Sequence, residues 1–231
     1  MSDDTPPAAA PADSGKTDEK KPPFRRRVWH FFTRPSTRWA AGTLTAFGIV
    51  LGVLFWGGFN WAMELTNTES FCISCHEMEA NVYREYRNTI HYSNRSGVRA
   101  TCSDCHVPRE WIYKVVRKVK ATRELFYHFT GEINTAEKFE KKRMQLAKNV
   151  WYEMKTTDSR ECRNCHNFTF MDLAVQEPRA AERHTQAAKE GKTCIDCHRG
   201  IAHRLPEGAL EVDLEQLVFE REGGAATVRR E

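Results

Sequence analysis

The sequence predicts a mainly α-helical protein in which one N-terminal transmembrane helix is followed by a small helical domain. Three observations predict this fold class. A long uncharged run lies near the N-terminus, helical apolar periodicity follows it, and neither an alternating strand pattern nor an Asn-Gly hairpin signal appears. Apolar residues make up 40% of the 231 residues, an ordinary share that is concentrated in the N-terminal run.

Residues 39–63 have the length of a transmembrane helix. As a helix this run would extend about 37 Å, more than the ~30 Å hydrocarbon core of a bilayer. A basic stretch that includes Arg25–Arg27 precedes it, and Glu64 follows it. Because positive charge marks the cytoplasmic flank, the N-terminus is expected in the cytoplasm and the chain after Glu64 outside it. The run is too long for a cleaved signal peptide and lacks a compact cleavage site.

All eight cysteines lie in Cys-x-x-Cys pairs, and a histidine follows each pair directly. Two thiols at this spacing form thioether bonds to one haem, and the next histidine can ligate its iron. Zinc ribbons and redox sites share the pair but do not call for that histidine. We therefore expect four covalently bound haem c groups. The thioether residues are Cys72, Cys75, Cys102, Cys105, Cys162, Cys165, Cys194 and Cys197, and the motif histidines are His76, His106, His166 and His198.

The spacing of the motifs predicts the domain organisation. The motifs begin at positions 72, 102, 162 and 194, which is typical of a dihaem unit used twice and joined by a longer linker. We expect four segments: a disordered, basic cytoplasmic tail at 1–38, the transmembrane anchor at 39–63, a periplasmic tetrahaem domain at 64–206, and a C-terminal tail at 207–231 without assigned chemistry.

Two long helices are predicted between the dihaem units. Apolar residues recur on one face of 111–130, and Gly131 is a plausible stop. A second helix is expected from Asn134, where Glu137 completes a capping-box-like start, to about Lys155.

The histidines outside the motifs are candidate distal ligands. The chain has nine histidines, and of the five outside the motifs His30 lies on the cytoplasmic side of the anchor. We expect His91, His184 and His203 to ligate haem iron. At the first motif three residues compete, because Met78 and His128 are alternatives to His76. A thioether ligand raises the reduction potential relative to two histidines.

Residues 35–206 resemble the NapC/NirT family of membrane-bound tetrahaem quinol dehydrogenases. The resemblance is carried by the anchor, the four motifs, the first motif with its trailing Met78, the stretch Cys102-Ser-Asp-Cys105-His106-Val-Pro, and the stretch from Cys194 to His203. It implies a single-pass protein of the bacterial inner membrane that oxidises menaquinol or ubiquinol. It also implies electron delivery to a periplasmic reductase, nitrate reductase in the leading interpretation and a nitrite reductase in the alternative.

The same resemblance implies roles for particular residues. Haem 1 would lie nearest the membrane, with Met78 as a ligand. His91 would ligate haem 4, while His184 and His203 would serve haems 2 and 3 in an order that stays open. Lys118 and Glu124 would form the quinol site, although Glu124 also fits a solvated helix face.

Two further function classes remain as alternatives. One is a periplasmic electron-transfer cytochrome without its own quinol site, and the other is a terminal reductase with an open haem. A formal net charge of +4 gives no nucleic-acid footprint, so no nucleic-acid partner is expected. The sequence leaves the quinone type and the oligomeric state open.

Overall fold

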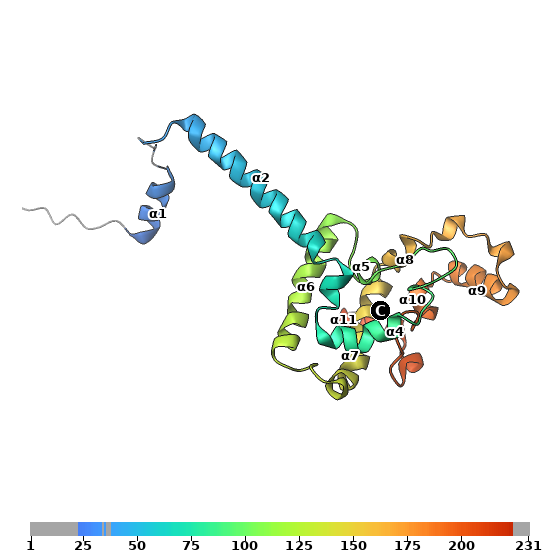
Figure 1. Cartoon of the computed structure of the whole chain (residues 1–231). Coiled ribbons are helices and arrows are strands. Elements are labelled where there is room, and N and C mark those ends of the chain that lie inside the picture. The colour runs from blue at the N-terminus through green and yellow to red at the C-terminus, as the bar shows by residue number, and fades with distance from the viewer. Residues whose placement is uncertain (1–22, 34, 36–37, 224–231) are drawn as a thin grey trace, which may run out of the picture. The chain divides into compact units, whose positions relative to one another are not determined.

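The structure is a computed structural model that describes residues 23–33, 35 and 38–223. The chain divides into two units at the Gly57–Gly58 junction. Figure 1 gives the order of the helices along the chain. The described residues contain helices and no strand, in agreement with the predicted fold class. The predicted disorder of residues 1–22 lies outside the described residues.

The anchor is α2, Ala41–Leu65, a helix of 25 residues with a mean hydropathy of 1.7. It begins and ends two residues after the predicted run 39–63. Its most apolar stretch has no buried residue, so length, composition and exposure all fit a membrane-spanning helix. Before it, Phe24–Thr33 forms a second helix, α1, within the segment expected to be a disordered and basic tail.

The second unit is built from two long helices and many short ones. The long helices are α6 (Trp111–Phe129) and α7 (Ala136–Thr156). The shorter elements are α3 (Glu69–Cys72), the π-helix η1 (Met78–Tyr83), α4 (Arg84–Tyr86), α5 (Cys102–His106), α8 (Arg160–Arg163), the 3-10 turns η2 (Phe168–Phe170) and η3 (Leu173–Val175), α9 (Pro178–Lys189), α10 (Cys194–Cys197), the 3-10 turn η4 (Ala209–Glu211) and α11 (Leu214–Arg221).

Both long helices were predicted, with one difference at a cap. α6 ends at Phe129, and Gly131 follows with φ 69°, a left-handed conformation that favours glycine. The N-cap of α7 is Thr135 rather than Asn134, because the Thr135 hydroxyl accepts the hydrogen bond from Lys138 N.

The core lies between α7, α10 and the C-terminal segment. Trp151 of α7 and Ile195 of α10 pack with Leu214 and Leu217 of α11 and with Ala209 of η4, and all five are buried. Leu214 is only 2% exposed. The segment that the sequence analysis left without a role thus covers α7 and the fourth motif.

Candidate haem-binding sites

Each Cys-x-x-Cys-His motif includes or closely follows one short helical turn. The second and fourth motifs, in α5 and α10, begin in the same way. Thr101 and Thr193 are their N-caps, and the aspartate inside each motif, Asp104 or Asp196, accepts a hydrogen bond from the N-cap backbone N–H at 2.8 and 2.7 Å. This capping box uses residues between the two cysteines, so the motif sequence itself sets the turn that orients its thiols.

The motifs contact one another in chain order. The backbone N–H of Ile195 in the fourth motif donates to Ser159 Oγ, directly before α8, at 3.1 Å. Burial raises the pKa of the Cys105 thiol in the second motif to about 11. Contacts between α3 and α5 and between α5 and α8 agree with this order.

Three motif histidines each face a histidine from elsewhere in the chain. The ring centroids are 6.2 Å apart for His106 and His203, 6.2 Å for His166 and His91, and 5.9 Å for His198 and His184. Two imidazole nitrogens, each about 2 Å from one metal ion on opposite sides, put the ring centroids roughly 6 Å apart. The spacing therefore fits one iron between the rings of each pair.

The hydrogen-bond partners of two distal histidines contact Nδ1, so that Nε2 stays available to ligate iron. His203 Nδ1 lies 3.2 Å from the Val82 carbonyl oxygen, and His184 Nδ1 lies 2.7 Å from the Gln176 side-chain oxygen. Carbonyl and amide oxygens only accept, so both histidines donate from Nδ1 and keep an unprotonated Nε2 for a metal. His91 Nδ1 is buried without a hydrogen-bond partner.

Burial also favours the neutral, ligating form of one pair. The pKa of His106 falls to about 4, chiefly because the ring is buried and secondly because His203 and Arg117 lie near it. The pKa of His203 is lowered as well, again mainly by burial. A metal ligand must be a neutral imidazole, so both shifts prepare this pair for iron.

The ring pairs differ in part from the ligation that the resemblance implied. His91 faces His166 of the third motif rather than the fourth motif, and His184 faces His198 of the fourth motif rather than the second or third. His203 faces His106 of the second motif, one of its two expected places. The reason is the fold: the turn after α4 brings His91 to α8, whereas α9 folds its own His184 back onto the adjacent α10.

The first motif is different from these three pairs. His76 and His128 also have centroids 6.2 Å apart, but a carboxylate is shared between them. Glu77 Oε1 accepts a hydrogen bond from His128 Nδ1 at 2.6 Å and lies 3.8 Å from His76 Nε2. Glu77 is 2% exposed; burial raises its pKa, but hydrogen bonds from its own backbone and from His128 outweigh this and lower it. Met78, the next residue, is half-buried at the start of η1.

The contact between Glu77 and His128 was not predicted from the sequence. The only signal was its position directly after His76, since the contact spans 51 residues of chain. The group Cys75, Glu77 and His128 could also hold a metal ion by its donor atoms, although Cys75 belongs to the first haem motif.

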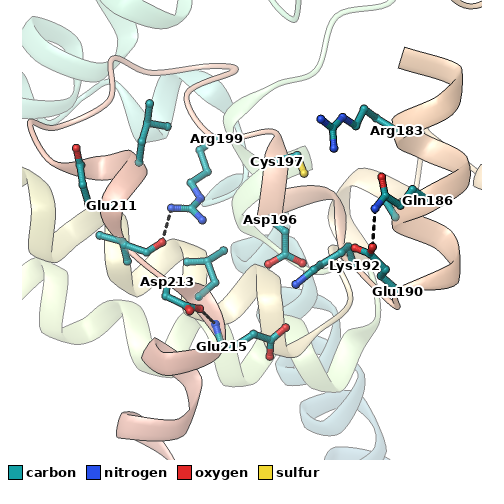
Figure 2. A pocket seen from close by; sticks show the side chains of 14 residues that line it. Arg183, Gln186, Glu190, Lys192, Asp196, Cys197, Arg199, Glu211, Asp213 and Glu215 are labelled. Carbon is teal, nitrogen blue, oxygen red and sulfur yellow. Dashed lines mark hydrogen bonds between the residues drawn. The ribbon is translucent and has the colours of Figure 1, made fainter. Parts of the chain in front are cut away.

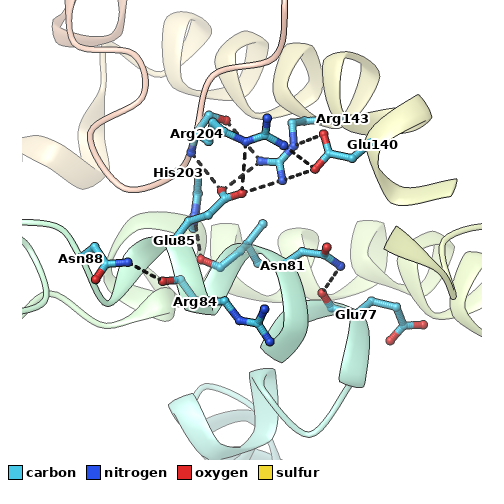
Figure 3. Close-up of polar contacts among 10 residues, drawn as sticks. Glu77, Asn81, Arg84, Glu85, Asn88, Glu140, Arg143, His203 and Arg204 are labelled. Carbon is cyan, nitrogen blue, oxygen red and sulfur yellow. Dashed lines mark hydrogen bonds and ion pairs between the residues drawn. The ribbon is translucent and has the colours of Figure 1, made fainter. Parts of the chain in front are cut away.

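A buried ionic network fixes the segment that carries His203 (Figure 3). Arg143 of α7 is the centre, with its side chain 6% exposed. It donates to both oxygens of Glu85 at 2.7 and 3.0 Å, and to both oxygens of Glu140 at 2.8 and 2.9 Å. Glu85 also accepts from the backbone N–H of Arg204 at 2.9 Å, so the residue next to His203 is held to α4.

Lys118 lies at the junction between the end of the anchor and the segment that leads to the first motif. Its ammonium donates to Thr66 O at 2.8 Å and to Thr66 Oγ1 at 2.9 Å, directly after α2. Burial lowers the pKa of Lys118, while the charges of Cys72 and Glu64 act in the opposite direction. Glu124 instead pairs with Arg117 at 2.9 Å and is 58% exposed.

An open cleft of about 410 Å³ adjoins the fourth motif (Figure 2). Arg183 and Gln186 of α9 line one side, and Asp196 and Cys197 of the motif lie opposite. Arg199 closes the cleft toward the C-terminal segment by donating to the backbone oxygens of Ala209 and Val212. Cys197 lines the cleft, so the cleft adjoins the place where the fourth motif would attach its haem.

The residues present fit covalently bound haem. Each motif offers two thiols and a histidine, and each has a second imidazole at the spacing that one iron requires, although at the first motif Glu77 binds that second ring. With a membrane-spanning helix at the start, these features define a membrane-anchored multihaem c-type cytochrome.

Comparison with known proteins gives the family. Residues 34–208 match the model of the NapC/NirT cytochrome c family, N-terminal region, and the chain belongs to this family. It is 59% identical to the denitrification system component NirT of Stutzerimonas stutzeri over 78% of this chain and 90% of NirT. It is 55% identical to the cytochrome c-type protein NapC of Escherichia coli K12 over 82% of this chain and 94% of NapC.

A third relative is longer than this chain. Identity to the cytochrome c-type protein TorC of Escherichia coli K12 is 45% over 79% of this chain, but the match covers only 47% of TorC. No solved structure matches the chain. The family establishes a membrane-anchored c-type cytochrome that carries covalent haem c and acts in electron transfer.

Proposed function

We propose that the chain is a membrane quinol dehydrogenase that passes electrons through four c-type haems to a periplasmic reductase. One observation carries the proposal: the first motif, which differs from the other three, adjoins the end of the anchor. Lys118 connects the two, because it binds Thr66, which lies between α2 and the short helix α3 that ends at Cys72. A quinol that diffuses in the membrane would meet this motif first.

The chain's own residues would hold the haems and handle the protons. Covalent haem, when bound, supplies a centre that takes up and releases one electron at a time. The eight cysteines would attach the four haems, and the pairs His106–His203, His166–His91 and His198–His184 would ligate three irons. At the first motif Met78 stays our proposed ligand, with Glu77 holding His128 beside it.

Quinol oxidation also releases two protons, so the site needs a proton acceptor. We propose that Lys118 donates a hydrogen bond to the quinol oxygen. Glu124 is the proposed acceptor from the family resemblance, and Glu64 is a second candidate because its charge acts on Lys118. Both carboxylates are more than half exposed and so have access to water for onward release of the proton.

We place the haem domain in the periplasm and the N-terminus in the cytoplasm. The basic residues Arg25–Arg27 before the anchor support this orientation. We propose nitrate reductase as the electron acceptor, on the resemblance to NapC-type donors. A reductase of denitrification is the second candidate, because the chain is 59% identical to the denitrification component NirT.

The direct test is reduction of the holoprotein in membranes by a menaquinol analogue. Lys118→Ala should slow the reduction at least about tenfold, because the hydrogen-bond donor to the quinol is lost. Lys120→Ala is the matched control, since Lys120 pairs with Glu153 on the exposed surface. Dithionite should reduce both variants fully. Normal quinol reduction of Lys118→Ala would contradict the assignment of the site.

A further inference from the structure

We infer that the first turns of α6 enter the membrane interface beside the anchor, so that the protein contacts lipid through two helices rather than one. The inference uses the membrane anchor and is independent of quinol oxidation. Its partner is the lipid bilayer itself, at the boundary between hydrocarbon and headgroups.

Three residues of α6 contact the last turns of α2 and the residue after it, in the same order along both segments. Trp111 Nε1 donates to Asn60 Oδ1 at 3.2 Å, and the Trp111 ring lies 6.4 Å from that of Phe59. One turn later Lys114 pairs with Glu64 at 2.6 Å. After one more turn Lys118 binds Thr66. The two helices therefore run side by side with the same sense, and the start of α6 lies deepest along the anchor.

The depth of this start follows from the length of the anchor. A helix of 25 residues is about 37 Å long and exceeds a ~30 Å hydrocarbon core by roughly 7 Å. Asn60 lies five residues before the end of α2 at Leu65, which is also about 7 Å along the helix axis. Trp111, at the level of Asn60, would thus lie where the hydrocarbon meets the headgroups.

The residues at this level have the chemistry of a membrane interface. Trp61 is 67% exposed, Ile112 is 68% exposed and Val116 is 46% exposed, and none of the three is covered by the rest of the domain. Trp111 adds an indole, the side chain that is enriched at bilayer boundaries. Exposing this surface to water would be unfavourable, whereas lipid covers it at no cost.

Positively charged side chains lie next to the apolar turn, on the side where the lipid headgroups would be. Lys114 and Lys118 come after the apolar turn and lie at the levels of Glu64 and Thr66. Arg160, which lies over the Tyr113 ring at 4.7 Å, and Arg109 add positive charge close to the same turn. Part of this charge is balanced, because Arg160 pairs with Glu161 and Glu110 and Arg109 pairs with Asp104. Apolar and aromatic groups thus lie at the level of the hydrocarbon boundary, and cations lie farther from the bilayer centre. This order fits an anionic lipid surface better than it fits a protein partner.

Photocrosslinking tests the inference in the full-length holoprotein. p-Benzoylphenylalanine replaces Ile112, and in a second protein it replaces Phe129, which is 81% exposed at the other end of the same helix, about 25 Å away. Both proteins are placed in vesicles of phosphatidylethanolamine and phosphatidylglycerol, illuminated and digested. The haem absorption spectrum verifies that each variant is folded, and Val116 provides a second position if the probe at Ile112 disturbs the fold.

We expect lipid adducts at Ile112 in at least about tenfold excess over Phe129. Equal yields at the two positions would overturn the inference, because the start of α6 would then have no special place in the bilayer. Adducts of position 112 with another protein chain, without lipid, would overturn it too and would identify the surface as a subunit contact.

Discussion

The distal histidines differ in the hydrogen-bond partner of Nδ1, and this difference should change the reduction potentials of the haems. His203 donates to a backbone carbonyl, His184 donates to an amide oxygen, and His91 Nδ1 is buried without a hydrogen-bond partner. A stronger acceptor at Nδ1 makes the imidazole a more basic ligand, which favours oxidised iron. These differences would therefore help to separate the reduction potentials of otherwise similar haems.

Gln176→Leu tests this effect at the fourth haem. Without the amide oxygen, the His184 imidazole donates less electron density to the iron. The reduction potential of one haem should therefore rise by about 20–60 mV, the equivalent of one hydrogen bond. A spectroscopic redox titration measures the change. Gln216→Leu on α11 should leave all four potentials unchanged, because Gln216 is exposed and contacts Glu220 instead of a histidine. An unchanged titration for Gln176→Leu would show that the hydrogen bond has no influence on the haem.

At the scale of elements, the Arg143 network joins three segments that are distant in the sequence. Glu85 comes from α4, Arg143 and Glu140 from α7, and Arg204 from the loop after His203 (Figure 3). Such a buried charge is tolerated because several carboxylate oxygens surround it.

Arg143→Leu should therefore both destabilise the domain and disturb one haem. The loss leaves two carboxylates without their main partner, and we expect about 3 kcal/mol lower stability. The second haem should show a partly high-spin spectrum, because His203 is no longer held against His106. Lys141→Leu on the exposed side of α7 is the control and should stay within about 0.5 kcal/mol of the wild type. A purely global loss of stability with an unchanged haem spectrum would argue against a positioning role.

The C-terminal segment packs against α7, and two of its leucines, one buried and one exposed, test this packing. Leu214 is 2% exposed against Trp151, whereas Leu210, four residues earlier, is 78% exposed. Leu214→Ala should lower the free energy of unfolding by about 2–5 kcal/mol, because it leaves a cavity in the core. Leu210→Ala should change it by less than about 0.5 kcal/mol. Thermal unfolding followed by circular dichroism gives both values, and equal effects would contradict the packing.

For the whole molecule, local patterns in the sequence predicted the long helices well. The anchor and the helix at 111–130 depend on neighbouring residues, and both were predicted close to their observed positions. The pairing of histidines was not predictable in this way. His91 and His166 are 75 positions apart, and only the path of the chain through α6 and α7 decides that they meet.

The long-range acidic contacts escaped prediction for the same reason. Nothing near His128 in the sequence indicates Glu77, and nothing near His203 indicates Arg143. The role of the C-terminal segment was not predictable either, because its apolar residues form no motif and acquire a role only through contact with Trp151.

Electron paramagnetic resonance of the oxidised holoprotein tests the central claim, three histidine pairs from within one chain and a first haem that differs. We predict that His203→Ala, His91→Ala and His184→Ala each convert one different low-spin haem to a high-spin form. We also predict that His91→Ala and His166→Ala affect the same signal, whereas the signal of the first haem persists in all of them. A His184→Ala protein that keeps every low-spin signal, or a His91→Ala protein that loses the same signal as His198→Ala, would contradict the account.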